Sequence, residues 1–140
     1  MKFGTDGVRG VANSELTAEF ALRLGRAAAI VLVGANDRVS ERRSVVIGGD
    51  TRESTPMLDA ALAAGFAAEG VDVISLGVVP TPMVAFEAQR RDAVGARVSA
   101  SHNPVAANGI KLCAAGGVKL PDEVEQRIES QLEVLMPPTG

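Results

Sequence analysis

The chain has 140 residues, of which 46% are hydrophobic and 22% charged, a composition typical of one compact domain. A formal net charge of −3, with only 3% aromatic residues and neither Trp nor Tyr, disfavours nucleic acid and anionic membranes as partners. The single cysteine, Cys113, excludes an internal disulfide. With no signal-peptide pattern and no apolar stretch long enough to cross a membrane, we expect a cytoplasmic protein.

The first predicted element is an amphipathic helix over residues 16–32, where apolar side chains recur at helical spacing. Thr17 is placed to cap this helix, and Glu19 lies in its first turn. After a polar surface loop, residues 45–47 are a β-branched run that stops at residues 48–50. This pattern is typical of a strand buried on both faces.

A unit of strand, loop and helix then occurs twice. Thr55-Pro56 has the residues of a helix start, with Thr55 as the cap, and residues 71–76 form the next strand before Thr81-Pro82 opens another helix. The apolar face of the helix after Thr55 consists of Leu58, Ala61, Leu62, Gly65 and Phe66. Such alternation predicts right-handed crossovers and a three-layer α/β/α domain, its mainly parallel sheet covered by helices on both faces.

The C-terminal part is predicted to add a strand, a hairpin and a helix. The strand spans residues 94–98, and a polar loop over 99–104 separates it from a hairpin of residues 110–113 and 118–120. The last helix opens at Pro121 and ends before Pro137. We therefore expect one domain over residues 1–136, with residues 137–140 starting an interdomain linker.

The only histidine, His102, adjoins Ser101 in the loop after the third strand, where open α/β sheets present their ligands. No Gly-x-Ser-x-Gly elbow surrounds Ser101, and adjacent side chains diverge, so a Ser-His-Asp hydrolase is disfavoured. A serine without a base can still carry a phosphoryl group. From spacing alone, however, the Ser-His-Asn-Pro run is more simply interpreted as a polar turn.

Two segments join glycine to a cation: residues 5–10, which include Arg9, and residues 108–111, which end at Lys111. Glycine lets backbone N–H groups approach an anion, while Arg and Lys bind phosphate oxygens. Alone, each segment is also an ordinary turn signal, and a turn is the simpler interpretation. Residues 48–52 match no phosphate-binding pattern and are expected to form a turn into a capped helix.

Metal binding by this chain alone is not expected, because it has one His, one Cys and no spaced carboxylate cluster. Acidic residues do gather on the last predicted helix, where they are expected to form a solvated face. These residues are Asp122, Glu123, Glu125, Glu129 and Glu133.

Three segments taken together resemble the α-D-phosphohexomutase superfamily. They are Phe3-Gly4-Thr5-Asp6-Gly7-Val8-Arg9-Gly10, Ser99-Ala100-Ser101-His102-Asn103-Pro104 and Asn108-Gly109-Ile110-Lys111. The first segment and the Ser-Ala before Ser101 are similar to the bacterial phosphoglucosamine mutases. The resemblance runs from residue 3 to the last helix and covers only the first domain of that family. The family's Asp-Gly-Asp-x-Asp loop and its later sugar- and phosphate-recognition loops are absent from this sequence.

The resemblance implies interconversion of glucosamine 6-phosphate and glucosamine 1-phosphate through a bound bisphosphate. Ser101 would carry the phosphoryl group, while His102 and Asn103 would shape and contact its loop. Lys111 would act as a cation and proton-transfer partner, and Arg9 would help to hold the charged centre. Mg²⁺ would bind through the phosphate on Ser101 and through the family's Asp-rich loop.

Other functions stay open at this point. One is a phosphoglucomutase or phosphomannomutase of the same superfamily, and another is a non-catalytic α/β interaction module whose loop at 101–104 is only structural. The expected partners are a hexosamine phosphate and the remaining domains of a longer protein. Alone, the chain is expected to lack mutase activity and to self-associate through an apolar patch where a neighbouring domain would pack.

Overall fold

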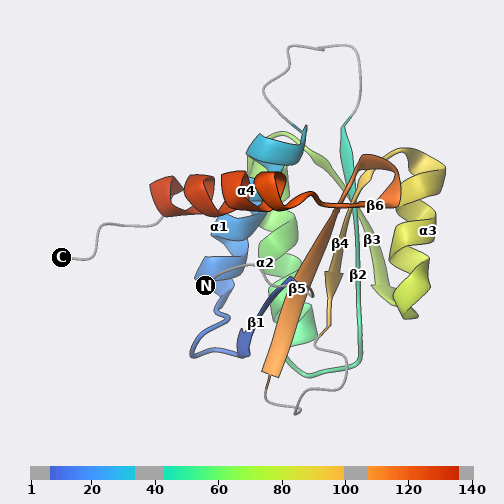
Figure 1. Cartoon of the computed structure of the whole chain (residues 1–140). Helices are drawn as coiled ribbons and strands as arrows, with labels where there is room; N and C mark the ends of the chain where they lie inside the picture. Colours follow the sequence, from blue (N-terminus) through green and yellow to red (C-terminus); the bar gives the residue numbers. More distant parts are fainter. Residues whose placement is uncertain (1–6, 34–42, 100–106, 136–140) are drawn as a thin grey trace.

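The computed structural model describes residues 7–33, 43–99 and 107–135, and within these ranges the chain forms a six-stranded sheet. The strand order is β1-β5-β4-β2-β3, and β6 pairs with β5 (Figure 1). The strands are β1 (Val8–Val11), β2 (Ser44–Gly49), β3 (Asp72–Val78), β4 (Val94–Val98), β5 (Ala107–Ala114) and β6 (Val118–Lys119). The predicted strands and the C-terminal hairpin are therefore confirmed, whereas β1 was not predicted.

The sheet is mixed, so the expectation of a mainly parallel sheet holds only in part. β2 is parallel to β3 and to β4, but β5 is antiparallel to β4, β1 and β6. Parallel neighbours need a crossover of about a dozen residues or more, usually with a helix. Only residues 99–106 join β4 to β5, so β5 must return antiparallel.

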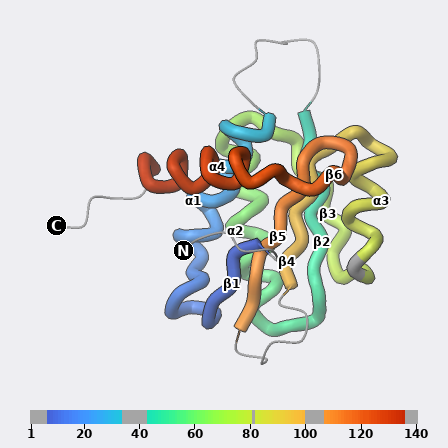
Figure 2. Tube along the Cα trace, in the orientation of Figure 1, coloured from blue at the N-terminus to red at the C-terminus, as the bar shows by residue number. Residues whose placement is uncertain are grey.

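Helices cover both faces of the sheet, which confirms the three-layer α/β/α architecture (Figures 1 and 2). They are α1 (Ala18–Ala28), which continues into a π-helical turn (Ala29–Val33), α2 (Thr55–Ala68), α3 (Thr81–Arg91) and α4 (Asp122–Leu135). α3 lies on one face, α1 and α2 lie on the other, and α4 packs against α1. A short 3₁₀ turn (Ala115–Gly117) links β5 to β6.

The predicted capping residue is confirmed for α1 but not for α2. Thr17 caps α1 as predicted, because its Oγ1 accepts a hydrogen bond from Phe20 N at 3.0 Å. The prediction that Thr55 caps α2 is wrong: Ser54 occupies the cap position and makes no side-chain capping bond. Thr55 is instead the first helical residue, and its hydroxyl is bonded to Asp50, which follows β2.

The core lies between the sheet and the α1–α2 layer. The helices supply Phe20, Leu24, Leu58, Leu62 and Phe66, and the strands supply Val45, Ile47, Val98 and Ile110. Leu16, just before α1, is also buried in this core. α1 and α2 meet closely at Gly25 and Gly65. A Cβ atom on Gly65 would overlap the Leu22 carbonyl oxygen and lie 2.9 Å from Arg26 N. Because glycine has no Cβ atom, Gly65 allows the backbones of α1 and α2 to come into contact. None of the helices in the described ranges combines the length and apolar character needed to span a membrane.

Gly65→Ala should lower the free energy of unfolding by about 1–3 kcal/mol, because the added methyl group must push α1 and α2 apart. The loss should outweigh the roughly 1 kcal/mol by which alanine is the better helix former. Urea unfolding measures it, with Ala64→Ser on the exposed side of α2 as the control, expected to stay within about 0.5 kcal/mol. A Gly65→Ala protein as stable as the unchanged chain would refute this close helix contact.

Candidate functional site

The predicted loop residues Ser101, His102 and Asn103 lie outside the described residues, but both ends of their segment are described. The segment leaves the carboxyl end of β4 after Ser99 and enters β5 at Ala107. The carboxyl end of the parallel neighbour β2 lies beside this point, because Asp50 N donates to Val98 O at 3.1 Å. The site is therefore built at the edge of the sheet where open α/β sheets bind ligands.

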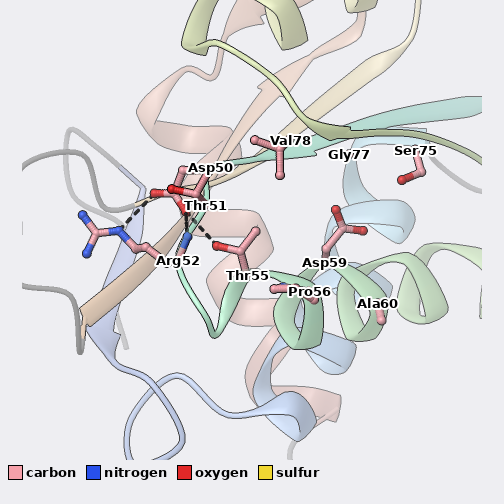
Figure 3. Close-up of a pocket in the computed structure, with 10 residues that line it drawn as sticks. All are labelled: Asp50, Thr51, Arg52, Thr55, Pro56, Asp59, Ala60, Ser75, Gly77 and Val78. Carbon is pink, nitrogen blue, oxygen red and sulfur yellow. Dashed lines mark hydrogen bonds and ion pairs between the residues drawn. The ribbon is translucent and has the colours of Figure 1, made fainter.

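Asp50 is the centre of a hydrogen-bonded cluster at this edge (Figure 3). Its Oδ1 accepts from the Thr55 hydroxyl at 2.8 Å and from Arg52 N at 3.1 Å. Its Oδ2 accepts from Arg52 Nε at 3.0 Å, and the Ser99 side chain is also hydrogen bonded to the carboxylate. One carboxylate thus connects β2, the start of α2 and the end of β4.

Burial raises the pKa of Asp50, but the hydrogen bonds from Thr55, Arg52 and Ser99 together outweigh burial and leave the pKa below the ordinary aspartate value. The group is therefore a carboxylate at neutral pH. Its negative charge is matched by the Arg52 guanidinium, whose side chain is only 12% exposed. Because Asp50 and Arg52 carry opposite charges and form an ion pair, the net charge of the cluster is close to zero.

Asn108 joins the start of β5 to the same cluster. Its side chain is fully buried, and its Nδ2 donates to Ser54 Oγ at 2.8 Å and to Thr55 Oγ1 at 3.1 Å. Its Oδ1 accepts from Gly109 N at 2.8 Å. The interpretation of Asn108-Gly109 as a turn is therefore wrong: both residues lie inside β5, where Asn108 fixes the strand to the first residues of α2.

The two segments that join glycine to a cation pair with each other as antiparallel strands. Arg9 of β1 lies directly opposite Gly109 of β5, and Lys111 lies opposite Arg97 of β4. Directly opposite residues share a face of the sheet, as do residues two apart along one strand. Arg9, Lys111 and Arg97 therefore lie on one face, with Arg9 and Lys111 as diagonal neighbours across the pair of strands.

Gly109 gives the Arg9 side chain its place on this cationic face, which we define as Arg9, Arg97 and Lys111. A Cβ atom on Gly109 would lie 3.0 Å from Arg9 Cγ and 3.0 Å from Ser99 O, so the arginine stem crosses the strand where no side chain stands. Lys111 is exposed, while Arg9 and Arg97 are half-buried. Three cations so arranged are suited to a multiply charged anion.

A depression of about 340 Å³ lies beside the Asp50 cluster, between the start of α2 and the end of β3 (Figure 3). Its lining residues include Thr51, Asp59 and Ser75. The carboxyl group of Asp59 faces this depression, and burial raises its pKa above the ordinary aspartate value. The pKa of Asp50 is instead lowered, because hydrogen bonds outweigh burial there.

Sequence reasoning missed several members of the site. The expectation of a simple turn and capped helix at residues 48–52 overlooked the roles of Asp50 and Arg52. Arg97 was not singled out either, although it is the one charged residue in β4 (Val94–Val98). The usable signals were polar residues directly after a buried strand, and an arginine within an otherwise apolar one.

Asp50→Asn should lower the free energy of unfolding at pH 7 by about 1–3 kcal/mol, because the amide keeps the side-chain size but loses the charge-assisted bonds. The folded pKa of Asp50 is lowered, so its stabilising effect is complete above the ordinary aspartate pKa of about 4. The effect is lost as pH falls through the lowered folded value. Urea unfolding over a pH series should therefore show the difference between the two proteins shrinking in acid.

Asp59→Asn is the matched control, and its effect on the free energy of unfolding at pH 7 should have the opposite sign. The raised pKa of Asp59 means that its carboxylate costs stability at pH 7, so the amide should leave the protein equally stable or more stable there. The two proteins should converge at low pH, where Asp59 is protonated whether folded or unfolded. A deficit for Asp50→Asn that does not change with pH, or the same sign for both variants at pH 7, would contradict this assignment.

Comparison with known proteins identifies relatives that share this domain. The sequence profile of the phosphoglucomutase/phosphomannomutase α/β/α domain I matches residues 1–136. The chain is 54% identical over 134 residues to a phosphoglucosamine mutase of Corynebacterium aurimucosum, a match that covers 95% of this chain and 30% of the relative. It is 57% identical over 129 residues to a phosphoglucosamine mutase of Rhodococcus opacus, covering 91% of this chain and 28% of that protein.

Solved structures agree with the sequence comparison. A phosphoglucomutase/phosphomannomutase family protein from Burkholderia thailandensis superposes with a TM-score of 0.78 at 33% identity, covering 94% of this chain and 30% of that one. A structure from Thermus thermophilus gives a TM-score of 0.82 at 34% identity, with the same coverage. The chain spans about 30% of the length of the relatives that it matches. It belongs to the phosphoglucomutase/phosphomannomutase family and corresponds to the family's α/β/α domain I.

Proposed function

We propose that this chain is the phosphoserine-bearing domain of a phosphoglucosamine mutase, which interconverts glucosamine 6-phosphate and glucosamine 1-phosphate. The observation that carries the proposal is the placement of Arg9 and Lys111 on one face of the sheet. Lys111 lies in β5, which the segment containing Ser101 enters, and Arg9 lies in β1, which pairs with β5. Relatives with the name phosphoglucosamine mutase, at 54% and 57% identity, supply the substrate class.

In the proposed reaction, Ser101 carries the phosphoryl group. The oxygen of a sugar hydroxyl bonds to phosphorus as the bond from phosphorus to Ser101 Oγ breaks. The proton lost by the sugar hydroxyl is relayed to Oγ, which leaves a free serine and a sugar bisphosphate. The sugar bisphosphate then turns round and returns its other phosphoryl group to Ser101. Lys111 is the proposed proton-transfer partner, and His102 and Asn103 shape and contact the loop.

Electrostatics give the cationic face its proposed role. A phosphoserine carries a charge of about −1.5 to −2 at neutral pH, and the sugar phosphate brings a second anion to the same place. Phosphoryl transfer depends almost entirely on positioning and on stabilising charge. Arg9 and Lys111 are proposed to neutralise this charge, and Arg97, which lies opposite Lys111, adds a third cation.

Mg²⁺ enters the proposal through the phosphate on Ser101. Among residues 7–33, 43–99 and 107–135, no group of three or more His, Cys, Asp or Glu side chains is placed to hold a metal ion. The Asp50 carboxylate is already engaged by Thr55 and Arg52. The described residues thus do not fit a complete magnesium site, and no step of the proposed reaction is assigned to the ion.

The remaining parts of the proposal concern the longer protein. We propose that residues 1–136 act together with further domains that supply the metal loop and the sugar contacts, with residues 137–140 at the start of the linker, in a cytoplasmic enzyme. Exposed apolar side chains at the end of β3 and on α3, Val78, Met83 and Phe86, are candidates for self-association of the isolated chain.

Ser101→Ala in the full-length protein should abolish mutase turnover, because no hydroxyl is left to carry the phosphoryl group. The assay follows conversion of glucosamine 6-phosphate to glucosamine 1-phosphate, and Ser130→Ala, on the exposed side of α4, is the matched control that should keep full activity. Normal turnover after Ser101→Ala would remove the proposed carrier and favour the interaction-module alternative. Faster conversion of glucose or mannose phosphates by the unchanged protein would instead assign it to the phosphoglucomutase or phosphomannomutase branch.

The 140-residue chain purified alone should show no measurable turnover of glucosamine 6-phosphate, since the proposed metal ligands and sugar contacts lie on other domains. The full-length phosphoglucosamine mutase of Corynebacterium aurimucosum serves as the positive control in the same assay. Turnover by the isolated chain that Ser101→Ala eliminates would show that this domain suffices for the chemistry.

A further inference from the structure

Residues 50–55 hold both ends of the segment that contains Ser101. At the first end, the Ser99 side chain bonds to the Asp50 carboxylate, and Ser99 N donates to Gly109 O at 2.9 Å. At the second end, Arg52 Nη1 donates to Ala107 O at 3.2 Å. A side chain of the loop after β2 therefore sets where the segment re-enters the sheet.

Arg52 connects the Asp50 carboxylate to the backbone of Ala107 through a single side chain. Its Nε is held by Asp50 Oδ2 at 3.0 Å while its Nη1 reaches Ala107 O. The planar guanidinium fixes the angle between these two bonds, so the carbonyl of Ala107 is placed relative to the carboxylate of Asp50. A lysine has the same charge but no such fork, and it cannot make both bonds with the same geometry.

This role differs from that of the cationic face. The charge of Arg52 is matched by Asp50 at hydrogen-bond distance, and its side chain is 12% exposed, so it contributes little net field toward an anion. Arg9 and Lys111 lie instead on β1 and β5, at register positions next to Gly109. Arg52 is therefore suited to fix the backbone and not to bind a phosphate group.

We propose that Arg52, oriented by Asp50, is a positioning residue for phosphoryl transfer, because it fixes the backbone at Ala107, where the segment that contains Ser101 enters β5. This inference rests on the proposed function, since it assumes that Ser101 carries the phosphoryl group. A displacement of about 1 Å at a reacting atom can cost on the order of 100-fold in rate. Loss of the Arg52 bond therefore acts on the chemical step and leaves substrate binding nearly unchanged.

The test compares Arg52→Lys and Arg52→Met with the unchanged full-length protein. Arg90→Gln is the matched control, because Arg90 also forms an ion pair, with Glu87 on α3, but lies 55% exposed on the outer surface. The measurements are kcat and KM, the melting temperature, and the single-turnover rate at which phosphorylated Ser101 transfers its group to glucosamine 1-phosphate, followed by intact mass. Rates are divided by the phosphorylated fraction, measured by intact mass, and by the folded fraction, measured by circular dichroism, so that neither unphosphorylated nor unfolded molecules count.

Arg52→Lys should lower kcat and the single-turnover rate per folded molecule by about 10- to 100-fold, with KM within about two-fold. Its melting temperature should fall below that of the Arg90→Gln control, because Asp50 loses part of its hydrogen bonding. Arg52→Met should lower both rates at least as far. A single-turnover rate for Arg52→Lys within two-fold of the unchanged protein, or one that is restored once unfolded protein is discounted, would overturn the proposal. Ser101→Ala distinguishes failure of the Arg52 proposal from failure of the proposed function. Normal turnover in Ser101→Ala contradicts the proposed function itself, whatever the Arg52 variants do.

Discussion

The structure at the edge of the sheet depends on one partly buried interaction, the carboxylate of Asp50 with its ring of donors. Thr55, Arg52 and Ser99 come from α2, from the loop after β2 and from the end of β4, and all of them bond to this one group. A charged acceptor bonded several times in a partly buried place stabilises the fold strongly, and losing one partner leaves the others poorly satisfied. The same contacts that close the fold therefore also determine where the segment containing Ser101 begins and ends.

Strand register produces the second part of the site. Arg9 and Lys111 are about a hundred positions apart in the sequence, yet the antiparallel pairing of β1 with β5 puts them on the same face at neighbouring positions. The glycine between them matters as much as the cations, because the arginine stem lies across Gly109. The Asp50 cluster therefore holds the backbone and is nearly neutral, whereas the cationic face gathers three positive charges on one face of the sheet.

Much of the fold could be predicted from sequence, because helix periodicity and β-branched runs are local signals. The helix capped by Thr17, the buried strand after residue 43 and the C-terminal hairpin all follow such signals. The mixed character of the sheet does not follow from local signals, because the direction of β5 depends on the length of the connection from β4. The strand β1 was missed because it is short and because β5, the strand with which it pairs, lies about a hundred positions away in the sequence. Asp50 and Arg52 were interpreted as a turn because their partners, such as Ala107 and Ser99, are also distant in sequence.

The proposed function requires that Ser101 carries a phosphoryl group. The most direct measurement is peptide mapping by mass spectrometry of the full-length protein, before and after a single addition of glucosamine 1-phosphate. We expect one phosphoryl group on Ser101 in the peptide that spans residues 98–111, and its loss to the sugar within one turnover. Phosphate that stays on this peptide when substrate is added, or turnover by a protein that never carries phosphate there, would contradict it.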